Sequence, residues 1–187
     1  MVIKIHDYEK NGKFSIRKCY QALREPIVQV SWKRLICNNK ASPKSLFITW
    51  LAVLNRLATK TRLAQWNLVN DTSCVLCNDA EEDTQHLFFS CPYSAAVWVQ
   101  CLKIIGITRR PVSFLDEISI AASKCRRKSK VSQLYGIMFA EAVYNIWIQR
   151  NHQVFQGTHK LPQHTVDLIL LNVACRVPDT MKNHLYR

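Results

Sequence analysis

The sequence contains little glycine and proline, with 4 and 6 among 187 residues. This scarcity of turn-forming residues argues against an all-β protein and leaves room for long helices. Hydrophobic residues make up 48% of the chain and include five tryptophans, so a substantial core can form. We therefore expect a mainly α-helical protein whose length suits one compact domain, or one domain with a small appendage.

Long hydrophobic segments are also missing. The longest apolar run, at residues 46–54, is interrupted by Thr49 and is too short to span a bilayer. The first ten residues lack the apolar core of a signal peptide. We therefore expect an intracellular protein in a reducing compartment, nuclear or cytoplasmic, with no membrane contact and no structural disulfides.

Acidic residues are scarce and unevenly distributed, and the net charge is +13. Residues 1–70 carry thirteen Lys and Arg against three Asp and Glu, and residues 101–187 carry thirteen against five. Residues 71–100 carry no Lys or Arg against five Asp and Glu. The basic flanks indicate an anionic partner, RNA and/or DNA, that contacts the chain on either side of the acidic segment.

The acidic segment contains the motif C-x2-C-x8-H-x4-C, formed by Cys74, Cys77, His86 and Cys91. Three thiolates and one imidazole make the tetrahedral donor set of a closed structural Zn²⁺ site. A catalytic zinc ion would keep one position open for water beside an acid or base. The alternatives are a metal-free cysteine-rich turn and a catalytic or redox site. Four acidic residues in the loop between the ligands are interpreted as solvated: Asp79, Glu81, Glu82 and Asp83.

Apolar side chains recur at helical spacing along most of the chain. Prolines favour the first turn of a helix, so helices are predicted to begin at Pro43 and Pro92, and Ser113 is predicted to cap another. The longest helix is predicted from residue 131 until Gly157 ends it. Shorter helices are predicted at residues 18–23, at 30–37, after Thr59 and around 166–173, with a polar tail from Pro178.

Two further details of the local structure are predicted. An Asn-Gly pair at residues 11–12, between apolar or alternating runs at 2–5 and 14–17, favours a small N-terminal β-hairpin. In the helix that begins at Pro43, five apolar residues share one face, which we expect to be the core face: Phe47, Trp50, Leu51, Leu54 and Leu57. The predicted architecture is a helical bundle with this hairpin and an embedded zinc knuckle.

Two groups of cations are candidates for nucleic-acid contact. Lys60 and Arg62 lie in the first turn predicted after Thr59, where the helix dipole disfavours cations; they either face a ligand or are ordinary surface charge. The segment 124–130 contains five basic residues in seven. It is either a nucleic-acid patch or nuclear address, or a solvated linker between helices. Its proposed contacts are Arg126, Arg127, Lys128 and Lys130.

The zinc motif also carries a family resemblance. His86-Leu-Phe-Phe-Ser-Cys91-Pro92, followed by Val97-Trp98, resembles the zinc-binding domain of plant non-LTR retrotransposon reverse transcriptases. Several pieces resemble that family in the same order, both before the motif and, more loosely, after it: residues 12–17 with Tyr20, Trp32, Pro43-Lys44 with Phe47, Trp50 and Arg56-Leu57, Thr59 with Arg62 and Leu63, and Ile146-Trp147 with Arg150-Asn151 and Val154-Phe155.

The resemblance, taken together with the turn and helix patterns, predicts a particular domain organisation. An N-terminal strand at 1–11 precedes a reverse-transcriptase-type zinc-binding domain at 12–106. A helical extension with the basic cluster follows at 107–156, and a C-terminal helix and tail at 157–187. In such polyproteins the module lies between a polymerase and a ribonuclease H, and we expect it here without either.

We predict that the chain is not an enzyme. No Asp-Asp pair is available for a polymerase metal site, and Glu141, Asp167 and Asp179 offer no convincing set for a ribonuclease H. The predicted function is a non-catalytic zinc-binding module that assists RNA or DNA binding, without a small-molecule substrate. The alternatives are a zinc-stapled structural or protein-interaction domain with a protein partner, and a non-functional remnant of a retroelement.

Overall fold

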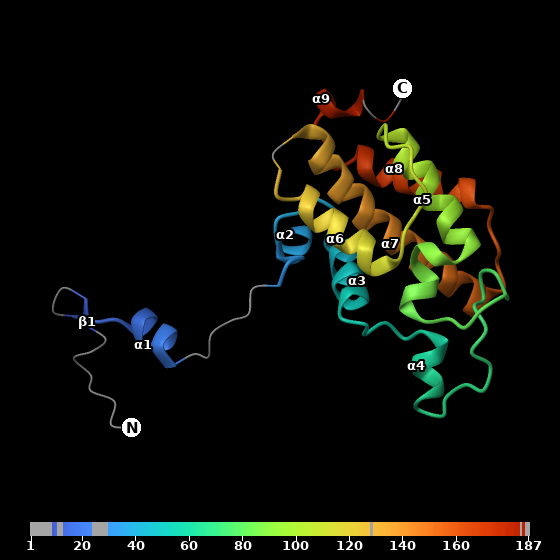
Figure 1. The fold of residues 1–187 in the computed structure, drawn as a ribbon, viewed down its shortest axis with the longest axis horizontal. Helices are drawn as coiled ribbons and strands as arrows, with labels where there is room; N and C mark the ends of the chain where they lie inside the picture. The colour runs from blue at the N-terminus through green and yellow to red at the C-terminus, as the bar shows by residue number, and fades with distance from the viewer. Residues whose placement is uncertain (1–8, 11–12, 24–29, 128, 184, 186–187) are drawn as a thin grey trace. The chain divides into compact units, whose positions relative to one another are not determined.

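The structure, a computed structural model, describes residues 9–10, 13–23, 30–127, 129–183 and 185 (Figure 1). The chain divides into two compact units, residues 1–30 and 31–187. The predicted strand at residues 2–5 and the Asn11-Gly12 pair lie outside the described residues.

The first unit contains a short hairpin followed by a helix. Strands β1 (Glu9–Lys10) and β2 (Lys13–Phe14) pair antiparallel, with Glu9 opposite Phe14, which confirms a small β-hairpin. The predicted second run at residues 14–17 is wrong beyond Phe14, because Ile16 and Arg17 are helical. Helix α1 (Ile16–Leu23) begins two residues before the predicted start. The hydroxyl of Ser15 accepts the backbone N–H of Lys18 at 3.3 Å, so this serine caps the helix two residues earlier than the apolar pattern indicated.

The second unit is helical, as predicted. Its elements are α2 (Lys33–Cys37), α3 (Pro43–Val53), α4 (Lys60–Ala64), the wide turn η2 (His86–Ser90), α5 (Pro92–Ile104), α6 (Phe114–Lys124), α7 (Lys130–Gln156), α8 (Pro162–Ala174) and α9 (Asp179–Lys182). Pro43 and Pro92 begin their helices as predicted, and the Ser113 hydroxyl accepts the Asp116 N–H at 3.2 Å. Gly157 ends α7 in the left-handed region, with φ of 64°, where glycine is strongly favoured.

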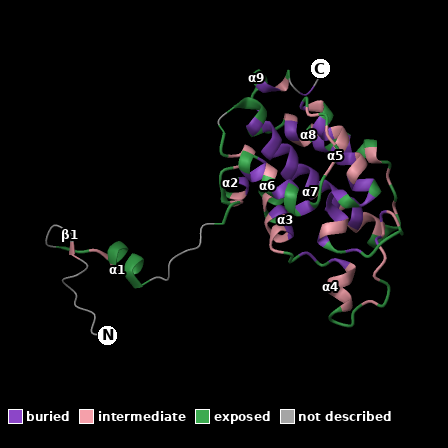
Figure 2. Ribbon diagram, in the orientation of Figure 1, coloured by how far each residue is buried: buried purple, intermediate pink, exposed green. Residues whose placement is uncertain are grey.

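Helix α7 forms the centre of this unit, and α3, α5, α6 and α8 pack against it (Figures 1 and 2). Its 27 residues include buried side chains on every face of the middle turns, from Leu134 to Arg150. Such all-round burial requires partners on several sides, which the four surrounding helices provide. The prediction of a long core helix is therefore confirmed.

The predicted core face of α3 is wrong for Phe47, whereas Leu51 packs against the core and Leu57, which follows the helix, is buried as predicted. The buried residues are Ser45, Thr49 and Ala52, whereas Phe47 is 55% exposed. These small side chains face α7, and small residues allow two helix backbones to approach closely. The Thr49 hydroxyl donates to the Ser45 carbonyl at 2.7 Å, so its burial leaves no unpaired donor.

The C-terminal segment is also more ordered than the polar tail predicted from Pro178. Helix α9 follows this proline, and Met181 and Leu185 are buried in the core. Two apolar residues four positions apart are too short a pattern to distinguish a docked turn from a tail. In the described part of the chain, no helix combines the length and apolar character needed to cross a membrane.

Candidate metal centre

The structure brings together the four side chains of the cysteine and histidine motif. Their candidate ligand atoms, one each from Cys74, Cys77, His86 and Cys91, all lie within 4.8 Å of one another. The Cys74 and Cys91 sulfurs are 4.0 Å apart, and Cys77 Sγ lies 3.2 Å from His86 Nε2. Zinc–sulfur bonds of about 2.3 Å place two sulfurs of a tetrahedron ~3.8 Å apart. The four side chains can therefore hold a metal ion, and a tetrahedral ion here would have no position left for water.

The first cysteine pair lies on a tight turn. The Asn78 N–H donates to the Cys74 carbonyl, and the Cys74 N–H donates to the Ala80 carbonyl, both at 2.7 Å. Asn78 has φ of 57°, a left-handed conformation that asparagine tolerates better than most residues. This turn directs both sulfurs of the pair toward one point.

The second pair is positioned by η2 and by the beginning of α5. The Cys91 N–H donates to the His86 carbonyl at 2.7 Å, which closes the wide turn between these two residues. Within the turn Phe89 has φ of 76°, and its N–H donates to Ser94 Oγ at 2.9 Å. A non-glycine residue in this region costs about 1–3 kcal/mol and needs compensation from its surroundings.

Aromatic packing provides that compensation. The Phe89 ring is buried, with its centroid 5.1 Å from Trp98 and 5.7 Å from Phe139, and it also contacts Phe114. These partners belong to α5, α6 and α7, so the core itself holds the turn that presents His86 and Cys91. Burial of one large aromatic side chain contributes roughly 1.5–3 kcal/mol, which is comparable to the strain.

The two buried cysteines have opposed pKa shifts. The hydrogen bond that Cys74 donates to Cys91 raises the pKa of Cys74 and lowers that of Cys91, while burial opposes the lowering at Cys91. Backbone N–H groups of Tyr93 and Ser94, in the first turn of α5, also lower the Cys91 pKa. The amides at a helix N-terminus thus favour the thiolate at Cys91, and thiolate is the form that binds metal.

The acidic loop is not entirely solvated, so that interpretation was wrong for Glu82. Its side chain is fully buried, and Oε1 accepts the Lys60 N–H and two hydrogen bonds from Arg150 of α7. The other three acids of the loop, Asp79, Glu81 and Asp83, are exposed. A sequence pattern could not identify Glu82, because its cationic partner lies 68 residues away.

Lys60 and Arg62 are both engaged with neighbours. Lys60 Nζ pairs with Asp71 at 2.7 Å, and Glu82 accepts the first N–H of α4, which offsets the unfavourable position of the cation. Arg62 donates from Nη1 to the Asn55 carbonyl at 2.7 Å, and its guanidinium lies 5.1 Å from the centroid of the Trp66 ring. Thr59 precedes α4, but its side chain makes no capping hydrogen bond.

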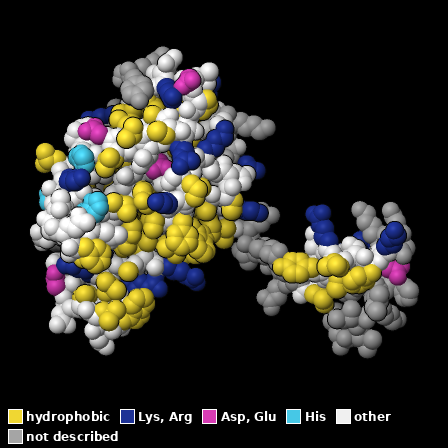
Figure 3. Space-filling view, turned by 180° about the vertical axis from the view of Figure 1, so that it is seen from behind, with side chains coloured by type: hydrophobic (Ala, Val, Ile, Leu, Met, Phe, Trp, Pro, Cys, Tyr) yellow, Lys and Arg dark blue, Asp and Glu magenta, His cyan; other side chains and the backbone are white. Residues whose placement is uncertain are grey.

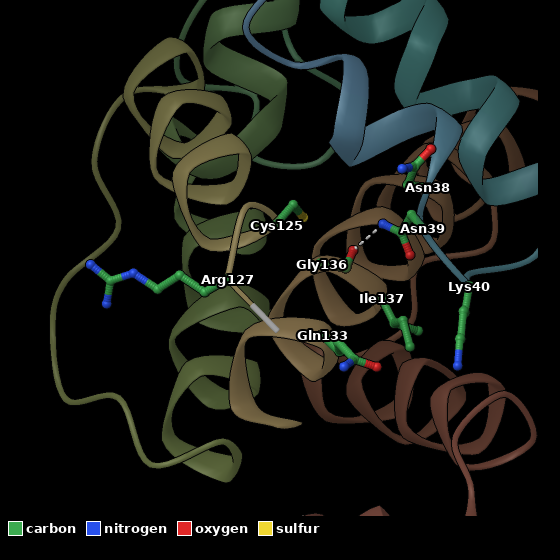
Figure 4. A pocket seen from close by; sticks show the side chains of 8 residues that line it. All are labelled: Asn38, Asn39, Lys40, Cys125, Arg127, Gln133, Gly136 and Ile137. Atoms are coloured by element: carbon green, nitrogen blue, oxygen red, sulfur yellow. Dashed lines mark hydrogen bonds between the residues drawn. The ribbon is translucent and has the colours of Figure 1, made fainter. Parts of the chain in front are cut away.

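The basic cluster lies on the connection between α6 and α7. Arg126, Arg127 and Lys130 are exposed, and Lys128 lies outside the described residues. Arg127 also lines a pocket of about 330 Å³ together with Lys40, which sequence reasoning missed because it is far from the cluster along the chain. In the view of Figure 4, Lys40 and Arg127 lie on opposite sides of the labelled group, and the Arg127 side chain extends away from the other labelled residues. Asn39 donates to the Gly136 carbonyl at 2.7 Å.

Comparison with known proteins supports the resemblance seen in the motif. Residues 14–98 match the model of a protein family described as zinc-binding in reverse transcriptase. The matched residues include all four candidate ligands and end within α5. No curated protein and no solved structure matches the chain.

Proposed function

We propose that this chain is a non-catalytic module derived from a plant non-LTR retrotransposon protein, and that it binds RNA or DNA through the phosphate backbone. Zn²⁺ at Cys74, Cys77, His86 and Cys91 staples the acidic loop to the N-terminus of α5. Three thiolate sulfurs and one imidazole suit zinc, and a tetrahedral ion bound by all four would have no position open for water, which supports a structural role.

The single observation that supports phosphate binding is the pocket beside the basic cluster. Folding places Lys40, from the connection between α2 and α3, at the same pocket as Arg127 (Figure 4). None of the eight lining residues, all in the described part of the chain, is acidic, and they include the amide side chains of Asn38, Asn39 and Gln133. Cations and amide donors are the groups that contact phosphate and sugar oxygens.

Hydrogen bonds of Asn39 hold the backbone around the pocket in place. Asn39 donates to the Gly136 carbonyl at 2.7 Å and accepts the Ala41 N–H at 3.0 Å, so both ends of its amide are fixed. The connection between α2 and α3 is thereby tied to the central helix. Phosphate contacts made here position a nucleic acid without reading its sequence, and we expect no base preference from this surface.

A salt series tests this function. Binding of the purified, zinc-loaded chain to single-stranded RNA, single-stranded DNA and duplex DNA is measured by fluorescence anisotropy at several salt concentrations. If several phosphates are neutralised, log affinity falls linearly with log salt, by about 0.7 to 0.9 per phosphate. An absence of binding at low salt, with the chain folded and loaded, would contradict the proposal and favour a protein-interaction module.

A further inference from the structure

A second pocket, of about 490 Å³, lies between α4 and the acidic loop. Its lining on the helix side includes Arg62, Gln65 and Trp66, and its lining on the loop side includes Glu81 and Asp83. The proposed phosphate-binding surface does not include this pocket. Its volume lies within the range of small-molecule and cofactor sites, about 300–1,000 Å³.

Trp66 is the largest side chain that lines this pocket. The Arg62 guanidinium lies 5.1 Å from its ring centroid, and Arg62 is itself anchored to the Asn55 carbonyl. Despite this contact the tryptophan is 54% exposed. A cation–π contact holds the indole in place while leaving much of the ring exposed. Every nucleobase has a π-face, so a base can stack on such an exposed ring.

The polar side chains that line the pocket favour a base over a phosphate. Glu81 and Asp83 are exposed carboxylates on the wall of the pocket, where they would repel a phosphate. Carboxylates instead accept hydrogen bonds from the amino groups of bases, and Arg62 and Gln65 supply donors for base oxygens and ring nitrogens. The combination of a stacking ring, acceptors and donors suits the edge of an unpaired base.

A second aromatic group lies nearby in the sequence, on α3. The rings of Phe47 and Trp50 are 5.9 Å apart, and Phe47 is exposed because α3 buries its opposite, small-residue face. Figure 3 shows hydrophobic side chains gathered on one face of the second unit, with Lys and Arg side chains among them. Exposed aromatic and basic side chains together fit a single-stranded nucleic acid, in which bases stack and the backbone meets cations.

We infer that the pocket between α4 and the acidic loop binds one unpaired nucleobase of a single-stranded nucleic acid, stacked on Trp66. This inference rests on the proposed nucleic-acid binding and names the part of the ligand that the acidic region contacts. The strand's phosphates lie on the basic surfaces, and one base enters the pocket. Duplex DNA, whose bases are stacked and paired, does not engage it.

The variant Trp66→Ala tests the inference, with Trp66→Phe as the conservative variant and Phe155→Ala as the matched control. Phe155 is a 77% exposed aromatic residue near the end of α7, and it is not among the residues that line the pocket. The zinc-loaded full chain is titrated with oligouridine, oligocytidine and oligoadenosine RNA, with their single-stranded DNA counterparts, and with duplex DNA. Melting curves establish that each variant is folded.

We expect Trp66→Ala to lose about tenfold affinity for single strands, since one stacked base contributes roughly 1–3 kcal/mol. Its salt slope and its duplex affinity should stay unchanged, Trp66→Phe should restore most of the loss, and Phe155→Ala should bind as the wild type. Wild-type affinity in Trp66→Ala would overturn the base pocket while leaving the phosphate surface intact. A wild-type chain that binds only duplex DNA would also overturn it.

The same experiment can overturn the proposed phosphate-binding function without overturning the base pocket. If the wild-type chain shows no salt-dependent binding but Trp66→Ala still weakens its binding to single strands, the base pocket stands and the phosphate surface is overturned. Equal losses for Trp66→Ala and for Phe155→Ala would show that exposed aromatic side chains act nonspecifically, and this would contradict the pocket.

Discussion

Arg150 donates two hydrogen bonds to one carboxylate oxygen of Glu82, from Nε at 3.0 Å and from Nη2 at 2.6 Å. Both side chains are buried, with 4% and 0% of their surfaces exposed. The guanidinium also lies 4.9 Å from the centroid of the Trp147 ring. Glu82 is in the loop between the candidate metal ligands and Arg150 is in α7, beyond the family match, so this pair joins the loop to the central helix.

Removal of one member of this pair should destabilise the chain strongly. Glu82→Ala leaves the Arg150 charge buried without its carboxylate, and breaking a buried pair in this way costs about 3–5 kcal/mol. Chemical denaturation of the zinc-loaded protein measures the loss. Asp179→Ala is the control, because its pair with Lys182 is exposed and should contribute little. An unchanged unfolding midpoint for Glu82→Ala would show that the loop is independent of α7.

The metal ligands should be required for a stable loop. Cys91→Ser removes a buried sulfur at the start of α5, and we expect loss of bound zinc, measured by elemental analysis, together with a lower melting temperature. Structural zinc contributes on the order of 10 kcal/mol of apparent binding free energy in small domains. The larger helical core here should retain part of the helical circular dichroism. Cys175→Ser, at an exposed cysteine, is the control. One equivalent of zinc retained in Cys91→Ser would contradict the four-ligand site.

The contact between Gly136 and Cys125 should restrict substitution in α7. A Cβ at position 136 would lie 2.8 Å from Cys125 Sγ, closer than side-chain atoms normally approach. Gly136→Ala should therefore destabilise the chain by about 1–3 kcal/mol, as overpacking does. In a Cys125→Ala background the same substitution should become neutral or stabilising, because alanine is the better helix former by about 1 kcal/mol. A double-mutant cycle of unfolding free energies measures the coupling, and additive effects would contradict the contact.

The cysteines outside the metal centre should differ widely in reactivity. Burial raises the pKa of Cys101 to about 12, whereas Cys37 and Cys175 are exposed. At pH 8 only ~1 in 10⁴ of a thiol with that pKa is thiolate, the reactive form. A maleimide time course read by peptide mass spectrometry should label Cys37 and Cys175 first, and Cys101 only after unfolding. Early labelling of Cys101 in the folded chain would contradict its burial.

Local signals in the sequence were sufficient for much of the fold. Pro43, Pro92, Ser113 and Gly157 mark helix ends through the geometry of a single turn, so they could be recognised without knowledge of the partners. The spacing of the motif likewise indicated four candidate metal ligands, and the fold brings their side chains together.

The errors arose where packing between distant segments decides the outcome. Phe47 follows a regular apolar pattern, yet the close approach of α3 to α7 selects Ser45, Thr49 and Ala52 for burial. Glu82 has the composition of a surface loop and is buried only because Arg150 reaches it. Lys40 lines the same pocket as Arg127 only because of the tertiary fold, which has no local signature in the sequence.

The salt dependence of nucleic-acid binding tests the central claim most directly. Arg126, Arg127, Lys128 and Lys130 are replaced together by alanine, and a control variant removes the same charge at four cations elsewhere: Lys103, Arg110, Lys160 and Arg176. Both variants and the wild-type chain are titrated with RNA and DNA across a salt series. Replacing the cluster should flatten the slope of log affinity against log salt by roughly two to three units without altering base preference, and the control should change it much less. A slope that is unaltered in the cluster variant, or equally flattened in the control, would contradict a phosphate-binding role for this cluster.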